Sequence, residues 1–248
     1  MIQELTYLPA KDQPVRFFTD RFTFRPGVNL LFGGNGAGKS SLCEALATII
    51  RTPEALPSSF RKALNVKASG SFVVYTYSNS ENNMARSSRD PVSMFDFTRL
   101  WDTKNQSEGQ SVLQALCDFL YMLNDDEAIP PDSEDVFILD EIDSGLDVEA
   151  CEYAVNTLKS IIARKPNIQI FVTFNQFEIS KLADEWLNVY TGAWEATKKQ
   201  YSEYFEYLSL QKKLYFRPTE HAIRVEENDA HIGMDDTDTD GNEDSINN

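Results

Sequence analysis

The chain has 248 residues, of which 42% are hydrophobic and 12% aromatic, as in a globular protein that buries a substantial core. Its formal net charge is −16, and nine of its 39 acidic residues lie between residues 226 and 248, a segment without lysine or arginine. The rest of the chain keeps a net charge of −7, which argues against a broad basic surface for DNA and leaves only a local basic groove open.

Composition also bears on metals, disulfides and membranes. Cys43, Cys117 and Cys151 lie far apart in helix-like stretches, so we expect small core residues rather than a disulfide set or a zinc site. Both histidines, His221 and His231, fall near the C-terminal end, which speaks against a histidine-rich metal site. No apolar run approaches the roughly 18 residues of a membrane span and no signal peptide is present, so we expect a cytoplasmic protein without membrane insertion.

The first 27 residues alternate apolar and polar side chains and end in Arg25-Pro26-Gly27. This pattern predicts a short antiparallel meander that closes in a Pro-Gly turn. Its four phenylalanines are expected in the core; they are Phe17, Phe18, Phe22 and Phe24.

Residues 28–42 read Val-Asn-Leu-Leu-Phe-Gly-Gly-Asn-Gly-Ala-Gly-Lys-Ser-Ser-Leu, an apolar strand joined to a helix by a glycine-rich loop. The loop satisfies the G-x-x-x-x-G-K-[ST] pattern of a P-loop, whose glycines let backbone N–H groups converge on phosphate oxygens. Lys39 can reach the β- and γ-phosphates, Ser40 can hold Mg²⁺, and the helix adds its positive N-terminal dipole. We therefore expect a bound nucleoside triphosphate; one of the N-terminal phenylalanines can stack on its base, and the sequence does not choose among them. The predicted phosphate ligands are Gly33, Asn35, Gly36, Ala37, Gly38, Lys39, Ser40 and Ser41.

Beyond this helix, which ends at Thr52-Pro53, the pattern is less regular. Residues 70–77 predict a strand followed by a polar turn, and a further strand over 84–88 is left open. Residues 90–105 suggest a packed segment, helical or irregular. Residues 106–123 lead from Gln-Ser-Glu-Gly-Gln into a strongly amphipathic helix, before an acidic loop over 124–135.

The second half contains a strand–helix–strand unit. Residues 136–139 (Val-Phe-Ile-Leu) form a continuous apolar run, as in a parallel strand that is covered on both faces. A helix over about 148–164 and a second buried strand at 168–173 complete a βαβ unit. A long aromatic-rich helix is predicted near 193–213, and the acidic segment from 226 has no core-forming pattern, so we expect it to be disordered.

Two carboxylates follow the first buried strand of this unit. Asp140 ends the strand and would complete Mg²⁺ coordination opposite Ser40. Glu141 is one residue further on, where a carboxylate can orient and deprotonate the attacking water. We therefore predict Ser40 and Asp140 as metal ligands, and Glu141 and Lys39 as catalytic residues.

Four motifs in this order resemble the ABC-type ATPase head, in the branch shared by SMC, RecF and double-strand-break-repair ATPases. They are the P-loop, a signature-like Ser107-x-Gly-Gln110, the strand ending in Asp140-Glu141, and Ser144-Gly-Leu-Asp147, which resembles the D-loop. The lead-in to the P-loop, residues 24–32, is also typical of that branch, and the resemblance covers roughly residues 15–190. It implies ATP, Mg²⁺ and an ATP-dependent homodimer in which Ser107, Gly109 and Gln110 of one subunit act on the nucleotide of the other. Asp147 would then communicate between the paired sites.

The chain departs from this family pattern at two places. The switch histidine expected after the second buried strand is replaced in Thr173-Phe174-Asn175, so Asn175 or Gln176 substitutes for it or turnover is slow. No glutamine occurs between Gln13 and Gln106, so the usual Q-loop ligand to Mg²⁺ is missing. Its possible substitutes are Asn79, Asn82 and Asn83.

The sequence therefore predicts an α/β P-loop ATPase head over residues 1–225, with a mixed, largely parallel core sheet, an antiparallel N-terminal β subdomain and a short helical signature region. Residues 226–248 form the acidic tail. The stretch between Lys39 and Ser107 is too short for a long coiled coil, so the chain resembles compact stand-alone members that work with a separate effector or nuclease, in DNA repair or mobile-element defence. Two alternatives remain, a transporter's ATP-binding subunit and a slow ATP sensor that regulates an effector.

Overall fold

The computed structural model describes residues 1–8, 17–55, 58–78 and 108–215. Residues Met1–Lys212 form one compact unit, to which the description below applies. The second unit, Lys213–Asn248, is described only over residues 213–215. The predicted boundary at residue 225 and the acidic tail lie outside the described residues, as do the possible strand over 84–88 and the segment 90–105.

Two sheets make up the strand content of the described residues. A three-stranded antiparallel sheet has the order β2-β1-β4, with β1 (Ile2–Tyr7), β2 (Arg21–Thr23) and β4 (Leu64–Ala68). A six-stranded sheet has the order β5-β6-β7-β3-β8-β9, with β3 (Gly27–Phe32), β5 (Val74–Ser78), β6 (Val136–Asp140), β7 (Gln169–Thr173), β8 (Glu185–Asn188) and β9 (Trp194–Ala196). Its neighbours pair in parallel except β8 and β9, which are antiparallel.

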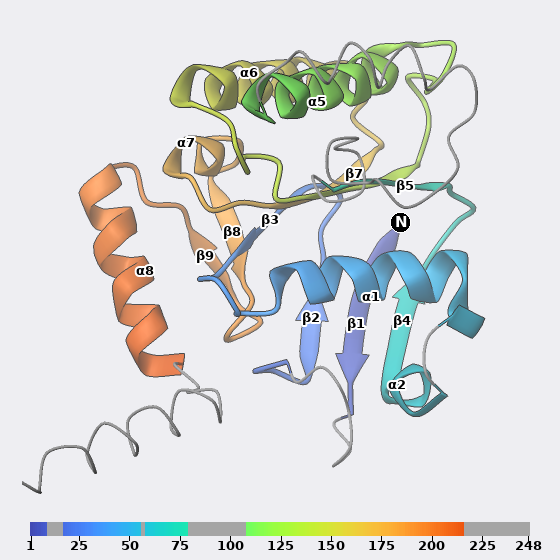
Figure 1. The fold of residues 1–248 in the computed structure, drawn as a ribbon. Coiled ribbons are helices and arrows are strands. Elements are labelled where there is room, and N and C mark those ends of the chain that lie inside the picture. Colours follow the sequence, from blue (N-terminus) through green and yellow to red (C-terminus); the bar gives the residue numbers. More distant parts are fainter. Residues whose placement is uncertain (9–16, 56–57, 79–107, 216–248) are drawn as a thin grey trace, which may run out of the picture. The chain divides into compact units, whose positions relative to one another are not determined.

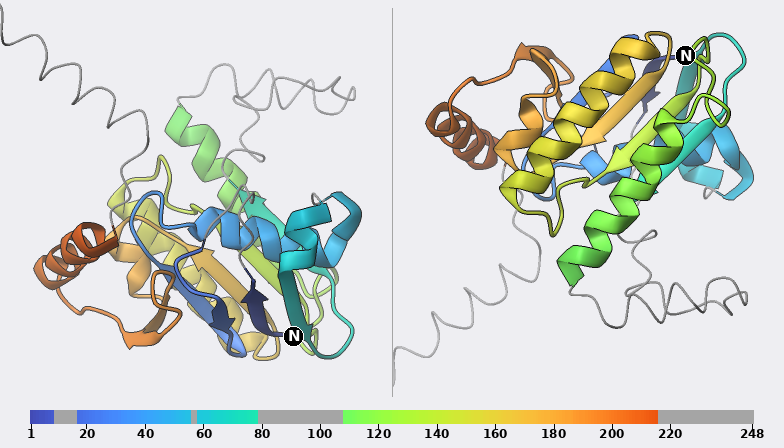
Figure 2. Two further views of the ribbon diagram at one scale, coloured as in Figure 1. Left: turned by 90° about the horizontal axis from the view of Figure 1, so that it is seen from below. Right: turned by 90° about the horizontal axis from the view of Figure 1, so that it is seen from above.

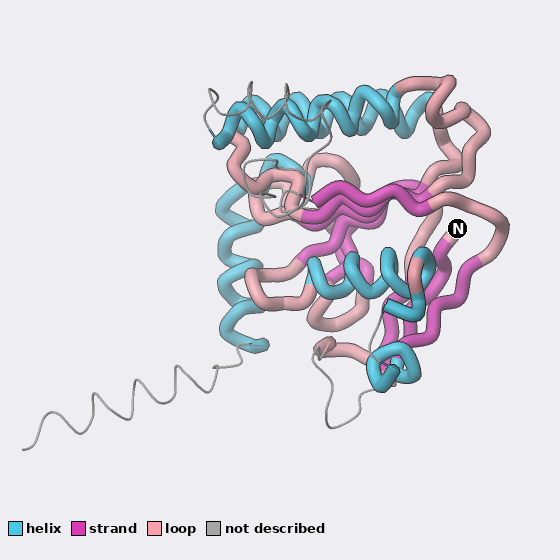
Figure 3. Tube along the Cα trace, turned by 45° about the vertical axis from the view of Figure 1, so that its right-hand side comes forward, coloured by secondary structure: helices cyan, strands magenta, loops and turns pink. Residues whose placement is uncertain are grey.

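Helices cover the six-stranded sheet on both faces (Figures 1 and 2). Helices α5 (Glu108–Asn124) and α6 (Val148–Arg164) pack together on one face, and α1 (Lys39–Arg51) lies on the other, on the side of the antiparallel sheet. A short 3₁₀ turn (Pro53–Ala55) and α2 (Ser58–Ala63) lead from α1 into β4. Figure 3 shows the strands of the main sheet between these helical layers. Helix α7 (Phe177–Ser180) follows β7, and α8 (Tyr201–Tyr215) ends the described chain.

The core lies between the main sheet and the α5–α6 layer. Helix α5 turns Leu116, Leu120 and Leu123 inward, and α6 turns Leu158 and Ile161 inward. The predicted buried strands are confirmed, because every residue of β7 and all of β6 except its last are buried. The predicted βαβ unit is confirmed as β6–α6–β7, with the two strands in parallel register.

The antiparallel meander is confirmed, but the prediction for it was incomplete. Its third strand, β4, follows α2 and was not predicted, because only Leu64 of its five residues is buried and the run shows no clear alternation. Gln169 of β7 joins this sheet to the main sheet: its Nε2 donates to the carbonyls of Ile2 (2.8 Å) and Arg25 (2.9 Å), and its Oε1 accepts from the N–H of Ile2 (2.8 Å).

The helix predicted near 193–213 was wrong in its first part. Residues 194–196 are strand β9, which forms an antiparallel hairpin with β8, a strand that was not predicted. The turn between them contains Gly192, which has a left-handed backbone conformation (φ 71°). Helix α8 starts only at Tyr201. The aromatic spacing that suggests one helix combines Trp194, on the hairpin, with Tyr201, Tyr204 and Leu208 on α8. The strand predicted at 70–77 is β5, displaced to 74–78.

Candidate nucleotide-binding site

The candidate site lies where strands β3, β6 and β7 end. Parallel neighbours present their carboxyl ends at one edge of the sheet, so the loops that follow Phe32, Asp140 and Thr173 meet there. The loop after β3 is the predicted P-loop. Of the two predicted carboxylates, Asp140 ends β6 and Glu141 begins the loop after it, and the loop after β7 carries Asn175.

The P-loop runs from Gly33 to the start of α1 at Lys39. Gly36 (φ 78°) and Gly38 (φ 95°) adopt left-handed conformations that favour glycine. Helix α1 has no side-chain cap at Gly38, and its first intrahelical hydrogen bond is donated by the N–H of Leu42. The amides at the helix start therefore remain available to an anion. Asn35, Gly36 and Ser40 are exposed, whereas Ala37 is buried and Ser41 half-buried.

The Lys39 side chain is folded back into this loop and is only 5% exposed. Its Nζ donates to the carbonyl oxygens of Gly33 (2.7 Å) and Gly34 (3.4 Å) and to Oδ1 of Asn175 (3.2 Å). Burial lowers the pKa of the Lys39 ammonium from its ordinary value, and the negative charges of Asp143, Glu141 and Asp140 oppose that shift. The side chain of Asn175, a predicted site residue, thus contacts the P-loop lysine, and its role toward a nucleotide stays a prediction.

Two glycines of the P-loop are in close contact with the C-terminal part of the unit. A Cβ on Gly33 would lie 2.6 Å from Cγ2 of Val189, and one on Gly34 would lie 2.6 Å from Cε of Lys212 in α8. The N–H of Gly34 also donates to the hydroxyl of Tyr190 (3.0 Å). The residues at these positions must therefore be small for packing as well as for phosphate approach.

The two carboxylates at the carboxyl end of β6, Asp140 and Glu141, are held by a threonine on the neighbouring strand. Oγ1 of Thr173 donates to Oδ1 of Asp140 (2.5 Å) and accepts the N–H of Glu141 (2.6 Å). Glu141 is exposed and has a left-handed backbone (φ 51°), so its side chain is free of the core. Thr173 is fully buried and was missed in the sequence, although its place at the end of β7 beside β6 is a usable signal.

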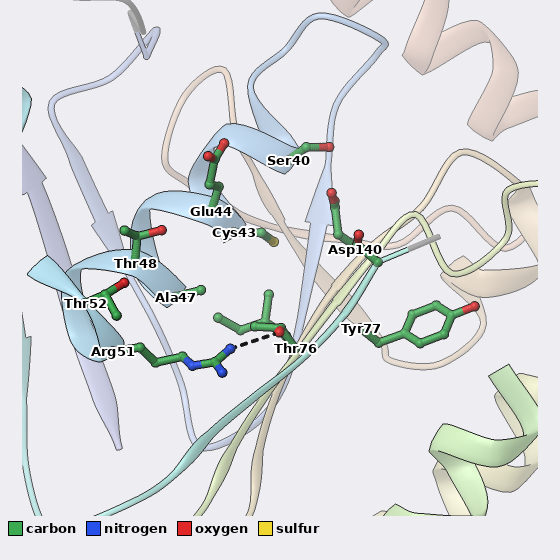
Figure 4. A pocket seen from close by; sticks show the side chains of 12 residues that line it. Ser40, Cys43, Glu44, Ala47, Thr48, Arg51, Thr52, Thr76, Tyr77 and Asp140 are labelled. Atoms are coloured by element: carbon green, nitrogen blue, oxygen red, sulfur yellow. Dashed lines mark hydrogen bonds between the residues drawn. The ribbon is translucent and has the colours of Figure 1, made fainter. Parts of the chain in front are cut away.

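Ser40 and Asp140 line the same cavity, of about 590 Å³, which runs along α1 beside β5 (Figure 4). At its far end Arg51 donates to the Thr76 hydroxyl (3.1 Å). The predicted pair of metal ligands thus shares one space. Ser78, the last residue of β5, pairs with Asp140. The asparagines predicted to replace the Q-loop glutamine, Asn79, Asn82 and Asn83, lie outside the described residues.

Phe174 does not face this site. Its side chain is 1% exposed and belongs to the core, with its ring 6.4 Å from that of Tyr204 in α8. The residue that stands in the place of the switch histidine is thus a core residue. Asn175 is the one that reaches the P-loop.

Asp143 is a buried residue that the sequence analysis missed. It is 1% exposed, and its Oδ2 accepts the backbone N–H groups of Asn175 (2.6 Å) and Gln176. The spacing Asp140-Glu-Ile-Asp143 is visible in the sequence. It does not show that the third carboxylate turns inward toward the loop after β7.

The remaining predicted residues lie on the α5–α6 layer. Gly109 and Gln110 are in the first turn of α5, and Ser107 lies outside the described residues. Asp147 is exposed and caps α6, with its Oδ1 accepting the N–H of Ala150 (2.8 Å). The structure therefore gives Asp147 a local role.

Comparison with known proteins gives a family. The family model described as AAA domain matches residues 13–228. A search of curated proteins gives no match. In the described residues, no helix has both the length and the apolar character needed to cross a membrane.

Solved structures give similarities of low sequence identity. One is the ATP-binding cassette MJ0796 in a dimeric, post-hydrolysis state bound to ADP and Pi (10% identity, 80% of this chain and 99% of that chain, TM-score 0.47). Another is the SMC head domain from Thermotoga maritima (15% identity, 79% and 99%, TM-score 0.45). A third is Stu0660 of Streptococcus thermophilus (13% identity, 90% and 84%, TM-score 0.47).

With TM-scores below 0.5, the assignment rests on the family model, which spans most of the chain, and on the strand order. A P-loop between β3 and α1, a largely parallel sheet and an antiparallel second sheet are the predicted α/β P-loop NTPase fold, which is confirmed. The chain belongs to the AAA domain family, and its fold is that of a P-loop NTPase.

Proposed function

We propose that this protein binds ATP with Mg²⁺ at the P-loop, hydrolyses it slowly and dimerises around two ATP molecules. The observation that carries the proposal is the arrangement around Lys39. The lysine is held against its own loop, and its nearest side-chain partner, Asn175, comes from the loop after β7. The ammonium of Lys39, the uncapped amides at the start of α1 and the carboxamide of Asn175 therefore lie together, where they could bind a triphosphate.

The donor set also fits the ion. The Ser40 hydroxyl and the Asp140 carboxylate line one cavity, and both are the hard oxygen ligands that Mg²⁺ prefers. When bound, Mg²⁺ supplies neutralisation of the phosphate charge. Thr173 would keep Asp140 oriented, since it already donates to Oδ1 of that carboxylate.

Hydrolysis would depend on Glu141. Its exposed carboxylate stands next to Asp140 and can accept a proton from the attacking water. Asn175 can donate a hydrogen bond to a phosphate oxygen but cannot take up a proton, unlike a histidine. This difference favours slow turnover.

The dimer proposal rests on which surfaces of the P-loop are open. Asn35 and Gly36 of the P-loop and the nearby Glu141 are exposed, so the part of the chain that the structure describes would cover bound ATP on one side only. Helix α5 lies on the face of the sheet opposite α1 (Figure 1), which favours a signature segment that acts on another subunit. Ser107, Gly109 and Gln110 would then close over the partner's γ-phosphate, with Asp147 close to the interface.

The cellular role follows by analogy with compact stand-alone members of the resembled branch: a separate effector or nuclease in DNA repair or mobile-element defence. The missing switch histidine and Q-loop glutamine count against a transporter subunit. A slow ATP sensor is the second candidate, because the buried Phe174 leaves the switch without a histidine at the site.

Glu141→Gln tests the proposal. Glutamine keeps the size and hydrogen bonding of the side chain but accepts no proton, so ATP binding should survive while hydrolysis falls by about 10²–10⁴-fold. Because hydrolysis no longer releases the bridging nucleotide, size-exclusion chromatography with ATP and Mg²⁺ should show a persistent dimer. Lys39→Ala is the matched control and should bind no ATP by calorimetry and stay monomeric.

Two results would contradict parts of the proposal. ATP binding by Lys39→Ala at wild-type affinity would refute the nucleotide site. A Glu141→Gln protein that binds ATP but stays monomeric at saturating nucleotide would refute the dimer and the roles of Ser107, Gly109 and Gln110.

A further inference from the structure

A buried carboxylate without full hydrogen-bond satisfaction lies beside the P-loop lysine. Asp143 is 1% exposed, and among the described residues its Oδ1 has no hydrogen-bond partner. Burial raises the pKa of this carboxyl, while the hydrogen bonds from Gln176 and Asn175 and the charge of Lys39 act in the opposite direction. A buried polar atom of this kind calls for an explanation, because burying a carboxylate is costly unless its surroundings compensate it.

Asp143 holds the loop after β7 by several hydrogen bonds. Its Oδ2 accepts the N–H groups of Asn175 (2.6 Å) and Gln176. Its carbonyl oxygen accepts from Nε2 of Gln176 (3.1 Å), which also donates to the carbonyl of Leu146 (2.9 Å). The segment after β6 and the loop after β7 are thus fastened together at Asp143.

Asn175 is consequently fixed at three atoms. Its N–H donates to Asp143, its carbonyl accepts from the Tyr204 hydroxyl (3.1 Å), and its Oδ1 accepts from Nζ of Lys39 (3.2 Å). With Oδ1 directed at the lysine, the Nδ2 group is the donor that remains for an anionic ligand.

We propose that Asp143 is a positioning residue for recognition of the terminal phosphate of ATP: it fixes Asn175 against Lys39. This inference rests on the proposed ATP site. It assigns Asp143 no contact with the nucleotide. Its specific consequence is discrimination, since Asn175 would contact the γ-phosphate, which ATP has and ADP lacks.

The test is the ratio of ATP to ADP affinity, measured by calorimetry with Mg²⁺ present and with a non-hydrolysable analogue standing in for ATP. Asp143→Ala releases the loop and should weaken ATP binding by about tenfold to a hundredfold, the range expected for a lost hydrogen bond to a charged group, with ADP binding unchanged. Asn175→Ala should lower the ratio by a similar factor. The double variant should be no worse than either single variant, because both changes remove the same interaction.

Asp143→Asn is the conservative variant. Its carboxamide oxygen can still accept both N–H groups but carries no charge, so the ATP preference should fall only about threefold, as expected for a neutral acceptor in place of a charged one. If Asp143→Ala does not fold, the ratio of ATP to ADP affinity of this variant tests the inference instead. The matched control is Asp135→Asn, which alters a carboxylate that accepts the N–H of Val73 (2.7 Å) away from the P-loop and should leave the ratio unchanged.

Three results would overturn the inference: an unchanged ratio in both Asp143 variants, an equal loss of ATP and ADP binding, or additive effects in the double variant with Asn175→Ala. A wild-type protein that binds neither nucleotide would instead refute the proposed ATP site. The two failures are therefore distinguishable.

Discussion

Replacement of Phe174 by histidine tests how the loop after β7 is built. The resembled family has a phosphate-sensing histidine at this point, so a motif argument expects Phe174→His to raise ATP turnover. The structure predicts loss of stability instead. The phenylalanine ring is 1% exposed and packs in the core near Tyr204, so the new imidazole would be buried among apolar groups rather than placed at the phosphates.

The cost has two parts. An unsatisfied buried polar group costs about 1–3 kcal/mol. The lost apolar burial and packing add about 1–2 kcal/mol. A total of roughly 2–5 kcal/mol corresponds to a fall in melting temperature of roughly 5–15 °C for a chain of this size. Phe174→Leu is the control and should cost less than about 1.5 kcal/mol, since it keeps an apolar side chain.

The pH dependence gives a second readout. A buried histidine kept neutral has a folded-state pKa below its unfolded value of about 6.5. The unfolded chain then binds more protons, so the stability of Phe174→His relative to wild type should fall further as the pH drops below about 6.5. Thermal unfolding at several pH values measures this. A Phe174→His protein with wild-type stability and faster ATP turnover would refute the burial of residue 174.

Two further substitutions test contacts of the fold. Gly34→Ala should lower the free energy of unfolding by about 1–3 kcal/mol, because its methyl group would overlap the Lys212 side chain. In chemical denaturation, adding Lys212→Ala should recover much of this loss, and no recovery would contradict that contact. Lys165→Met should lower the free energy of unfolding by roughly 2–4 kcal/mol, because the fully buried Nζ donates to the carbonyls of Asp125 (3.0 Å) and Ile129 and pairs with Asp126 (3.2 Å). The control Lys159→Met, at an exposed position, should change urea unfolding little, and equal effects of the two substitutions would refute the role of the buried lysine.

The sequence was informative where the signal is local. The P-loop pattern depends on spacing within a few residues, and the structure has the predicted strand, glycine-rich loop and helix in that order, with Lys39 starting α1. The continuous apolar runs of β6 and β7 predicted buried parallel strands for the reason observed, coverage on both faces. By contrast, β4 and β8 are short strands whose pairing is decided by distant partners, and neither was predicted.

The sequence analysis left open whether Asn175 or Gln176 substitutes for the switch histidine and did not decide which way Phe174 faces, although elementary geometry bears on that orientation. Side chains alternate across an extended strand, so residues 173 and 175 point to one side and residue 174 to the other. Thr173 contacts Asp140, which lies at the site, and Asn175 contacts Lys39. Alternation from an assigned Thr173 would therefore have placed Phe174 in the core. Asp143 could not be found this way, because its partners are more than thirty residues away in sequence.

The segment from β8 to α8 carries none of the sequence motifs, but its side chains contact both the P-loop and the loop after β7. Val189 and Lys212 pack against Gly33 and Gly34, and the Tyr190 hydroxyl accepts the N–H of Gly34. From α8, Tyr204 donates to the carbonyl of Asn175. The loop after β3 and the loop after β7 thus share one support, in addition to their direct link through Lys39.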